Sequence, residues 1–106
     1  MANKYYVSGA NFERRLKKYF ENKDYYVART AGSHGPFDLI AIHHELNDIL
    51  LIQCKIRPPL KAEYDKLRTA QAEFKNKEQF KFIMAYKVKG KFRFELLDKV
   101  FLEVIL

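Results

Sequence analysis

Apolar side chains recur at helical spacing in two segments of the chain. In the first segment they are Phe12, Leu16, Tyr19 and Phe20. This spacing of i, i+4, i+7 and i+8 forms one stripe along a helix, which predicts an amphipathic α-helix over residues 10–22. A second stripe predicts a helix over residues 61–76. Its positions are Leu60, Tyr64, Leu67, Gln71 and Phe74.

Shorter apolar runs, bounded by polar or turn-forming residues, predict strands. We expect these strands over residues 25–29, 37–42, 49–55, 80–86 and 92–97. The polar residues 43–48 indicate a hairpin loop, and Pro58-Pro59 must end the third strand because proline cannot donate to a central ladder. The order is helix, three strands, helix, and two or three strands. This order is typical of an α/β domain built around a mixed sheet.

The composition favours one small globular domain spanning residues 1–106 that binds a polyanion. The sequence is 48% hydrophobic and carries a formal net charge of +7, which favours nucleic acid over an anionic membrane as partner. No apolar run could span a bilayer, and the first residues lack a signal-peptide core. The single cysteine, Cys54, excludes an internal disulfide and a multi-cysteine zinc site. We therefore expect a cytoplasmic protein with no membrane partner.

The predicted hairpin brings three polar residues together. In an antiparallel pair, the numbers of any two facing residues add up to the same total, and half of that total is the centre of the turn. Pairing Asp38 with Cys54 places this centre at residue 46, inside the polar loop. Asp38 should then lie beside Gln53 and Lys55, which share one face of the strand while Cys54 points to the other. A carboxylate, an amide oxygen and an ammonium suit Mg²⁺-dependent phosphodiester hydrolysis. A salt bridge at a strand edge is the alternative.

The first half of the chain also carries a set of short motifs. They are Gly9, Phe12-Glu13-Arg14, Leu16, Val27-x-Arg29, Gly32-Ser33-x-Gly35, Asp38-Leu39-Ile40-Ala41 and Ile52-Gln53-Cys54-Lys55. Together they resemble the archaeal-type Holliday junction resolvases of the PD-(D/E)XK nuclease superfamily, over residues 8–57. The resemblance implies a restriction-endonuclease-like mixed β-sheet flanked by helices, in the order α-β-β-β-α-β-β.

The resemblance also implies an activity and a set of site residues. The activity is a metal-dependent, structure-selective DNA endonuclease that resolves four-way junctions with Mg²⁺, or with Mn²⁺ as the alternative ion. Ser33, Asp38 and Lys55 correspond to the catalytic residues of the family. Glu13, Asp38 and Gln53 correspond to its metal ligands.

Two departures from the family pattern keep other functions open. Pro36 stands one residue early relative to Asp38, and Gln53 replaces the acid of the E-x-K motif. A neutral amide is a weaker Mg²⁺ ligand than a carboxylate. Gln-x-Lys also resembles Mrr-like nucleases of the same superfamily. One alternative is therefore a nuclease with a different DNA substrate, and another is a DNA-binding protein with a decayed metal site.

Basic residues in several groups indicate DNA contacts with the backbone, independent of sequence. The candidates are Arg14, Arg29, His34, Arg57, Lys61, Lys89 and Lys91. Branched DNA is the expected partner. A four-way junction offers two opposed strands, so a homodimer with two sites is expected. The apolar residues 100–106 are expected at or near the dimer interface, since an apolar terminus must be covered.

Overall fold

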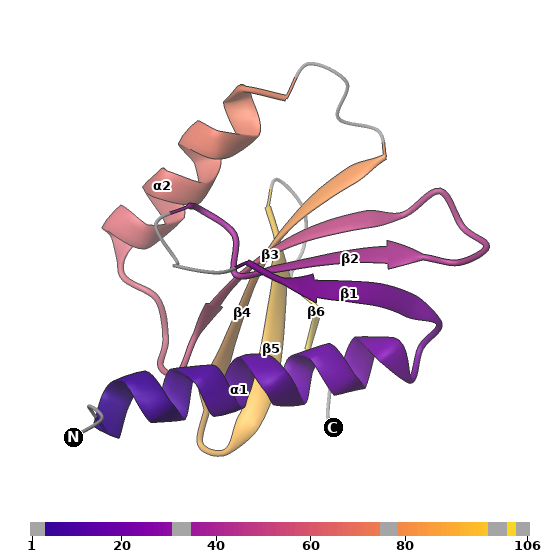
Figure 1. The fold of residues 1–106 in the computed structure, drawn as a ribbon. Helices are drawn as coiled ribbons and strands as arrows, with labels where there is room; N and C mark the ends of the chain where they lie inside the picture. Colours follow the sequence, from indigo (N-terminus) through magenta and orange to yellow (C-terminus); the bar gives the residue numbers. More distant parts are fainter. Residues whose placement is uncertain (1–3, 31–34, 75–78, 98–101, 104–106) are drawn as a thin grey trace.

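The structure is a computed structural model that describes residues 4–30, 35–74, 79–97 and 102–103. Within these ranges it contains two helices and six strands (Figure 1). They are α1 (Lys4–Glu21), β1 (Tyr25–Arg29), β2 (Leu39–His43), β3 (Ile49–Lys55), α2 (Lys61–Ala72), β4 (Phe80–Val88), β5 (Lys91–Leu96) and β6 (Leu102–Glu103). The predicted element order and mixed sheet are confirmed, and the short β6 extends the sheet by one strand.

The strands lie in the sheet in their sequence order, from β1 to β6. Every neighbouring pair is antiparallel except β3 and β4, which are parallel. A parallel pair needs a crossover connection, and α2 provides it. Since β3 and β4 run in the same direction, both end at the same edge, where Lys55 pairs with Tyr86. The polar end of β3 therefore lies beside the end of β4.

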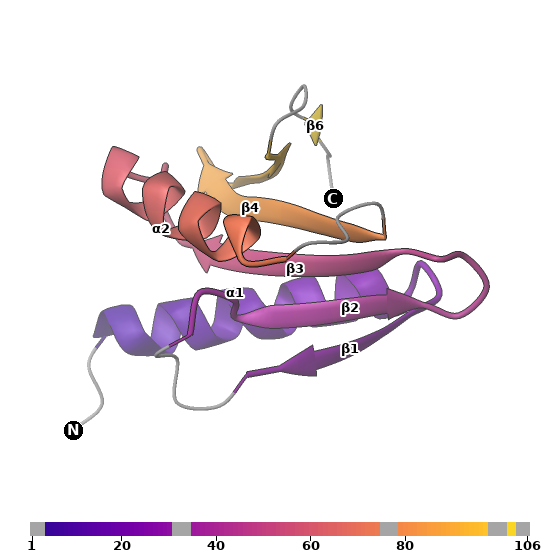
Figure 2. The ribbon, with the colours of Figure 1, turned by 90° about the horizontal axis from the view of Figure 1, so that it is seen from above.

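The two helices cover opposite faces of the sheet (Figures 1 and 2). Phe12, Leu16 and Phe20 of α1 are buried against one face, together with Cys54 of β3. On the other face, Leu51 of β3 packs in the cluster that includes Leu67 of α2. Cys54 and its even-numbered neighbours thus face α1, while the odd-numbered residues of β3 face α2, as the alternation predicted.

The register of the β2–β3 hairpin differs by one residue from the prediction. Leu39 pairs with Ile52 and Ile42 with Ile49. The numbers of facing residues therefore add up to 91, which places Asp38 opposite Gln53 and not opposite Cys54. A slip of one residue would turn Asp38 towards the α1 side, where Cys54 is buried. The observed register keeps the apolar side chains of both strands on matching faces, and it places Asp38 on the same face as Gln53.

The helix ends also differ from the prediction. The first helix begins at Lys4 and runs through Gly9, although glycine costs about 1 kcal/mol in a helix. The predicted start at residue 10 is therefore wrong. The second helix ends at Ala72, before residue 76. Leu60 is 60% exposed because it precedes the helix as its N-cap and does not join the apolar stripe.

The end of the chain is described only at β6, which pairs with β5. The remaining residues of the apolar segment 100–106 lie outside the described ranges. In the described part of the chain, no helix combines the length and the apolar character that crossing a membrane requires.

Candidate active site

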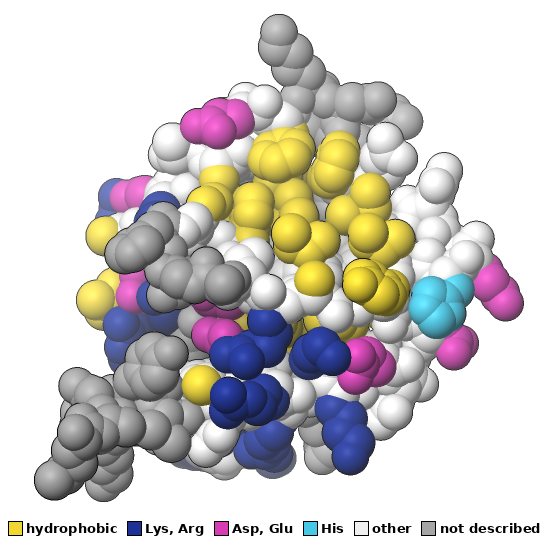
Figure 3. Space-filling view, in the orientation of Figure 1, with side chains coloured by type: hydrophobic (Ala, Val, Ile, Leu, Met, Phe, Trp, Pro, Cys, Tyr) yellow, Lys and Arg dark blue, Asp and Glu magenta, His cyan; other side chains and the backbone are white. Residues whose placement is uncertain are grey.

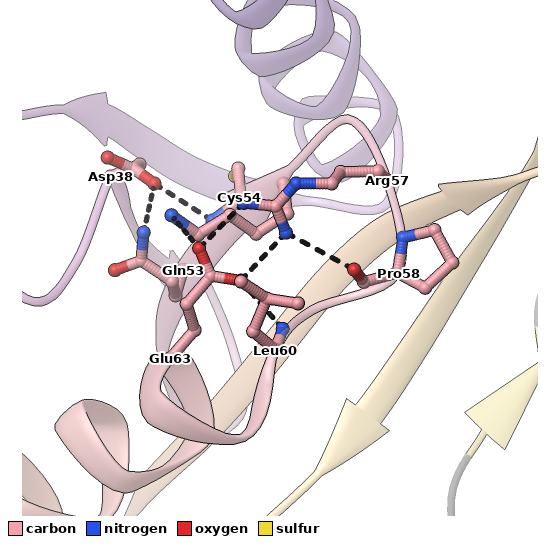
Figure 4. A network of polar contacts seen from close by, with 8 residues as sticks. Asp38, Gln53, Cys54, Arg57, Pro58, Leu60 and Glu63 are labelled. Carbon is pink, nitrogen blue, oxygen red and sulfur yellow. Dashed lines mark hydrogen bonds and ion pairs between the residues drawn. The ribbon is translucent and has the colours of Figure 1, made fainter.

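Asp38 lies immediately before β2 and is only 7% exposed. Its Oδ2 accepts hydrogen bonds from the backbone N–H of Cys54 at 2.8 Å and from Nε2 of Gln53 at 3.0 Å (Figure 4). Burial raises the pKa of Asp38, while the Cys54 N–H and the positive charge of Lys55 oppose that rise. The carboxylate is therefore fixed in direction by β3, and a nearby positive charge stabilises its ionised form.

Gln53 lies beside Asp38, as the sequence predicted. Its amide nitrogen is turned towards Asp38 and its amide oxygen points away (Figure 4). In this arrangement Gln53 acts as a donor to the carboxylate. A half-turn of the amide would bring its oxygen to the same place, which a cation bound to Asp38 would favour. The role of Gln53 as a metal ligand stays a prediction.

Glu13 reaches the site from α1, on the other side of the sheet edge. Its Oε1 accepts hydrogen bonds from Arg29 at the end of β1, at 3.1 Å from Nη2 and 3.3 Å from Nε. Burial is the main reason why the pKa of Glu13 is raised, and the negative charge of Asp38 raises it further. The ion pair with Arg29 holds Glu13 within electrostatic reach of Asp38. Arg29 therefore has a structural partner in addition to its predicted role in binding DNA.

These residues fit a divalent cation of the Mg²⁺ type. Mg²⁺ binds through one or two carboxylates and keeps several waters. Glu13 and Asp38 supply two carboxylates whose mutual repulsion raises the pKa of Glu13, and a cation between them would relieve that repulsion. The described residues contain no group of three His, Cys, Asp or Glu side chains suited to a metal ion. A third protein ligand would have to be of another type, and the amide oxygen of Gln53 is the predicted one.

Lys55 follows Gln53 by two residues on the same face of β3. Its Nζ lies 3.1 Å from Oε2 of Glu63, in the first turn of α2. Arg57 also binds this carboxylate, with distances of 2.8 and 2.9 Å to its two oxygens. The Arg57 hydrogen bond is the largest reason why the pKa of Glu63 is lowered to about 2, and Lys55 contributes to it. Glu63 is therefore ionised at neutral pH.

Glu63 is not among the residues that the sequence motifs predicted for the site. Only part of a signal was present: leucine is not a usual N-cap residue, but a glutamate three residues after a helix N-cap commonly reaches back to the N-cap N–H. Glu63 does so, accepting a hydrogen bond from the N–H of Leu60 at 2.8 Å. The ion pair with Lys55 is a contact between distant segments, and no local pattern reveals it.

The other candidate residues lie around this cluster or outside the described ranges. Ser33 and His34 belong to residues 31–34, which are outside those ranges. Arg14 is exposed on α1, and Lys61 is exposed and pairs with Asp65. Lys89 and Lys91 flank Gly90 in the β4–β5 turn, beyond the sheet end at which Lys55 pairs with Tyr86. Their roles in binding DNA stay predictions.

One face of the molecule combines a basic band with an apolar area (Figure 3). Lys and Arg side chains gather over α1, where Arg14, Arg15 and Lys18 are exposed. Apolar side chains gather above them, over β1 to β3. On the sheet face away from α1, Tyr26 is 66% exposed and Ile42 is 44% exposed. The two residues pair across β1 and β2.

Comparisons with known proteins agree with this geometry. The family model of the archaeal Holliday junction resolvases (Hjc) matches residues 4–103. A similar solved structure is Hjc from Archaeoglobus fulgidus, a Holliday junction resolvase from an archaeal hyperthermophile. It is 25% identical in sequence, with a TM-score of 0.60 over 82% of this chain and 70% of that chain. The search of curated proteins gives no match.

Replacing Gln53 with glutamate should make the stability of the protein depend on Mg²⁺. The variant loses the amide donor to Asp38 and gains a second negative charge beside it, so its metal-free form should be less stable than wild type by about 1–3 kcal/mol. Added Mg²⁺ should restore more stability to Gln53→Glu than to wild type. Thermal unfolding with EDTA and with millimolar Mg²⁺ measures both effects.

Gln53→Ala is the matched control, because it removes the hydrogen bond without adding charge. We expect it to be destabilised with EDTA and to gain no more from Mg²⁺ than wild type does. Equal stabilisation of all three proteins by Mg²⁺ would place position 53 outside the reach of the ion.

The acidity of Glu63 predicts a pH-dependent contribution to stability. Its pKa is about 2 in the folded protein against 4.5 ordinarily, so the contribution is complete above about pH 4.5 and is lost as the pH falls towards 2. Wild type should therefore exceed Glu63→Gln in free energy of unfolding by on the order of 1 kcal/mol near neutral pH, because solvent screens the pair with exposed Arg57. Denaturant titrations between about pH 3 and pH 7 should show this difference shrinking with acidity. A difference that stays constant over this range would contradict the assignment.

Proposed function

The chain belongs to the archaeal Holliday junction resolvase family, whose members are structure-selective nucleases, and on this premise we propose how its residues cut the junction. Asp38, Glu13 and Gln53 hold a Mg²⁺ ion, and Lys55 acts on the scissile phosphate. The observation that supports this proposal is the meeting of Asp38, Gln53 and Lys55 on one face of the sheet, at the end of β3.

The bound ion would supply an acidified water and a polarised phosphate, the chemistry that divalent ions provide in phosphodiester hydrolysis. Asp38 offers its second carboxylate oxygen, because Oδ2 accepts the hydrogen bond from the backbone N–H of Cys54. Lys55 places an ammonium on the same face, where it neutralises the charge that develops on the phosphate. The fixed direction of Asp38 reduces the reorganisation needed when substrate binds.

Nearby arginines are suited to holding the phosphates that flank the cut. Arg29 at the end of β1 and Arg57 after β3 both lie at the site, each paired with a glutamate. A guanidinium presents several donors in one plane and binds phosphate through two of them. These contacts are to the DNA backbone, so the enzyme selects the shape of a branched substrate and not its sequence.

We further propose that the enzyme is a homodimer and that the apolar area over β1 to β3 is its interface. The exposed members of this area are Tyr26 and Ile42, and the half-buried Ile40 and Ile49 lie beside them. Exposed apolar patches commonly mark interaction surfaces. A second copy related by a two-fold axis would cover this area and would present two sites to the two opposed strands of a junction. The area adjoins the site, since Ile40 stands two residues after Asp38.

Cleavage of a labelled synthetic four-way junction tests the proposed site. Asp38→Asn and Lys55→Ala should each lower the cleavage rate at least a hundredfold. Both should bind the junction about as well as wild type when Ca²⁺ replaces Mg²⁺. Linear duplex and flap substrates serve as controls for the choice of substrate.

The outcomes of this experiment separate the functions that the sequence left open. Wild-type rates for Asp38→Asn would show that the active site is wrong. Faster cutting of duplex than of junction would favour the Mrr-like nuclease. Binding of the junction without cleavage by wild type, with Mg²⁺ or Mn²⁺, would favour a DNA-binding protein whose metal site has decayed at Gln53.

Changing Ile42 to glutamate should disrupt the proposed dimer. A charge in the centre of an apolar interface costs several kcal/mol unless it is paired, so Ile42→Glu should be a folded monomer by light scattering. Leu46→Glu is the matched control, because Leu46 is an exposed aliphatic residue in the hairpin loop between β2 and β3. It should remain a dimer. A dimeric Ile42→Glu variant would exclude this face as the interface.

A further inference from the structure

The carboxylate of Glu63 connects three parts of the site. It receives Lys55 from the end of β3, Arg57 from the following loop, and the N–H of Leu60 from the start of α2. Figure 4 shows this carboxylate with dashed contacts to Arg57 and to the N–H of Leu60. Neither the resemblance to resolvases nor the hairpin geometry gave this residue a role.

The pairing with Arg57 and Leu60 limits how far the carboxylate can move. Arg57 binds one oxygen at 2.8 Å and the other at 2.9 Å, and Leu60 binds the first oxygen at 2.8 Å. A carboxylate held at both oxygens cannot turn to follow a mobile partner. Glu63 is therefore a fixed anchor, and the Lys55 ammonium lies 3.1 Å from it.

Lys55 needs such an anchor because its own strand provides none. A lysine side chain has several rotatable bonds and loses much conformational freedom when it is held in one place. Gln53, its neighbour on the same face of β3, is neutral and directs its amide donor to Asp38. The negative charge that pairs with Lys55 comes instead from α2, through Glu63.

We propose that Glu63 is a positioning residue for DNA cleavage: its carboxylate, fixed by Arg57 and by the N-terminus of α2, holds the Lys55 ammonium at the end of β3 in the orientation used for catalysis. This inference rests on the proposed catalytic role of Lys55. It makes the first turn of α2 part of the catalytic apparatus through the contact of Glu63 with Lys55.

A simpler role for Glu63 is to stabilise the start of α2, since it also binds the N–H of Leu60. The two roles differ in one respect. A positioning residue loses its effect when Lys55 is absent, whereas a residue that stabilises the helix has the same effect with or without Lys55.

A double-mutant cycle on junction cleavage separates the two roles. The four proteins are wild type, Glu63→Gln, Lys55→Ala and the double variant, assayed for kcat and KM with Mg²⁺. Misplacing a catalytic group by about 1 Å costs on the order of a hundredfold in rate. We therefore expect Glu63→Gln to lower kcat roughly tenfold to a hundredfold with little change in KM. In the Lys55→Ala background, the same change should alter kcat by less than about threefold.

Two further variants make the cycle decisive. Asp65→Asn removes a carboxylate from the same helix, where Asp65 pairs with exposed Lys61, and should leave kcat unchanged. It therefore controls for the lower repulsion of DNA by a less negative helix. Glu63→Asp keeps the charge on a shorter side chain and should recover part of the kcat lost in Glu63→Gln. If Glu63→Gln does not fold, as judged by thermal unfolding, Glu63→Asp takes its place in the cycle.

The failures of this inference and of the proposed function are distinguishable. If Glu63→Gln lowers kcat by the same factor with and without Lys55, the positioning role is wrong and the proposed active site stands. A loss confined to KM would also overturn the positioning role. If Lys55→Ala cleaves at the wild-type rate, the proposed catalytic role of Lys55 fails, and the inference fails with it.

Discussion

The register of the β2–β3 hairpin is the constraint on which the candidate site depends. Ile42 pairs with Ile49 and Leu39 with Ile52, and this pairing directs the side chain of Asp38 towards Gln53 and not into the α1 core. Two hydrogen bonds from β3 then fix the carboxylate. The register is itself imposed by burial, because a shift of one residue would expose Leu39 and Ala41, both completely buried beneath α1.

Much of this hairpin was predictable from the sequence. The polar residues 43–48 located the loop, and the predicted third strand, 49–55, has the bounds of β3. The register was missed by one residue because a loop midpoint at residue 45.5 or 46 fits the same polar segment. The alternation of apolar residues resolves the choice only when the faces of both strands are considered together. Pairing Asp38 with Cys54 conflicts with placing Asp38 beside Gln53, because directly paired residues lie on the same face and Cys54 points to the face opposite Gln53.

The contacts between distant segments were less predictable. The motifs identified Glu13, Asp38 and Lys55 as candidates, but not the partners that orient them. Arg29 binds Glu13 from β1, and Glu63 binds Lys55 from α2. Each pair joins two elements whose relative position is set by packing of the core, so spacing along the chain does not reveal it. The position of Glu63 three residues after the Leu60 N-cap explains the local geometry but not the ion pair.

The substitution of glutamine for the motif acid changes the charge balance of the whole site. With Gln53 neutral, the negative charge near the sheet edge comes from Asp38 and Glu13, and Arg29 offsets part of it. Fewer carboxylates repel the DNA backbone less, but they also attract a divalent ion less strongly. The same neutrality leaves Lys55 without a negative neighbour on β3, and Glu63 supplies that charge from the facing helix. Glu63 on α2 thus gives Lys55 the negative partner that the motif acid would give it from position 53 of β3.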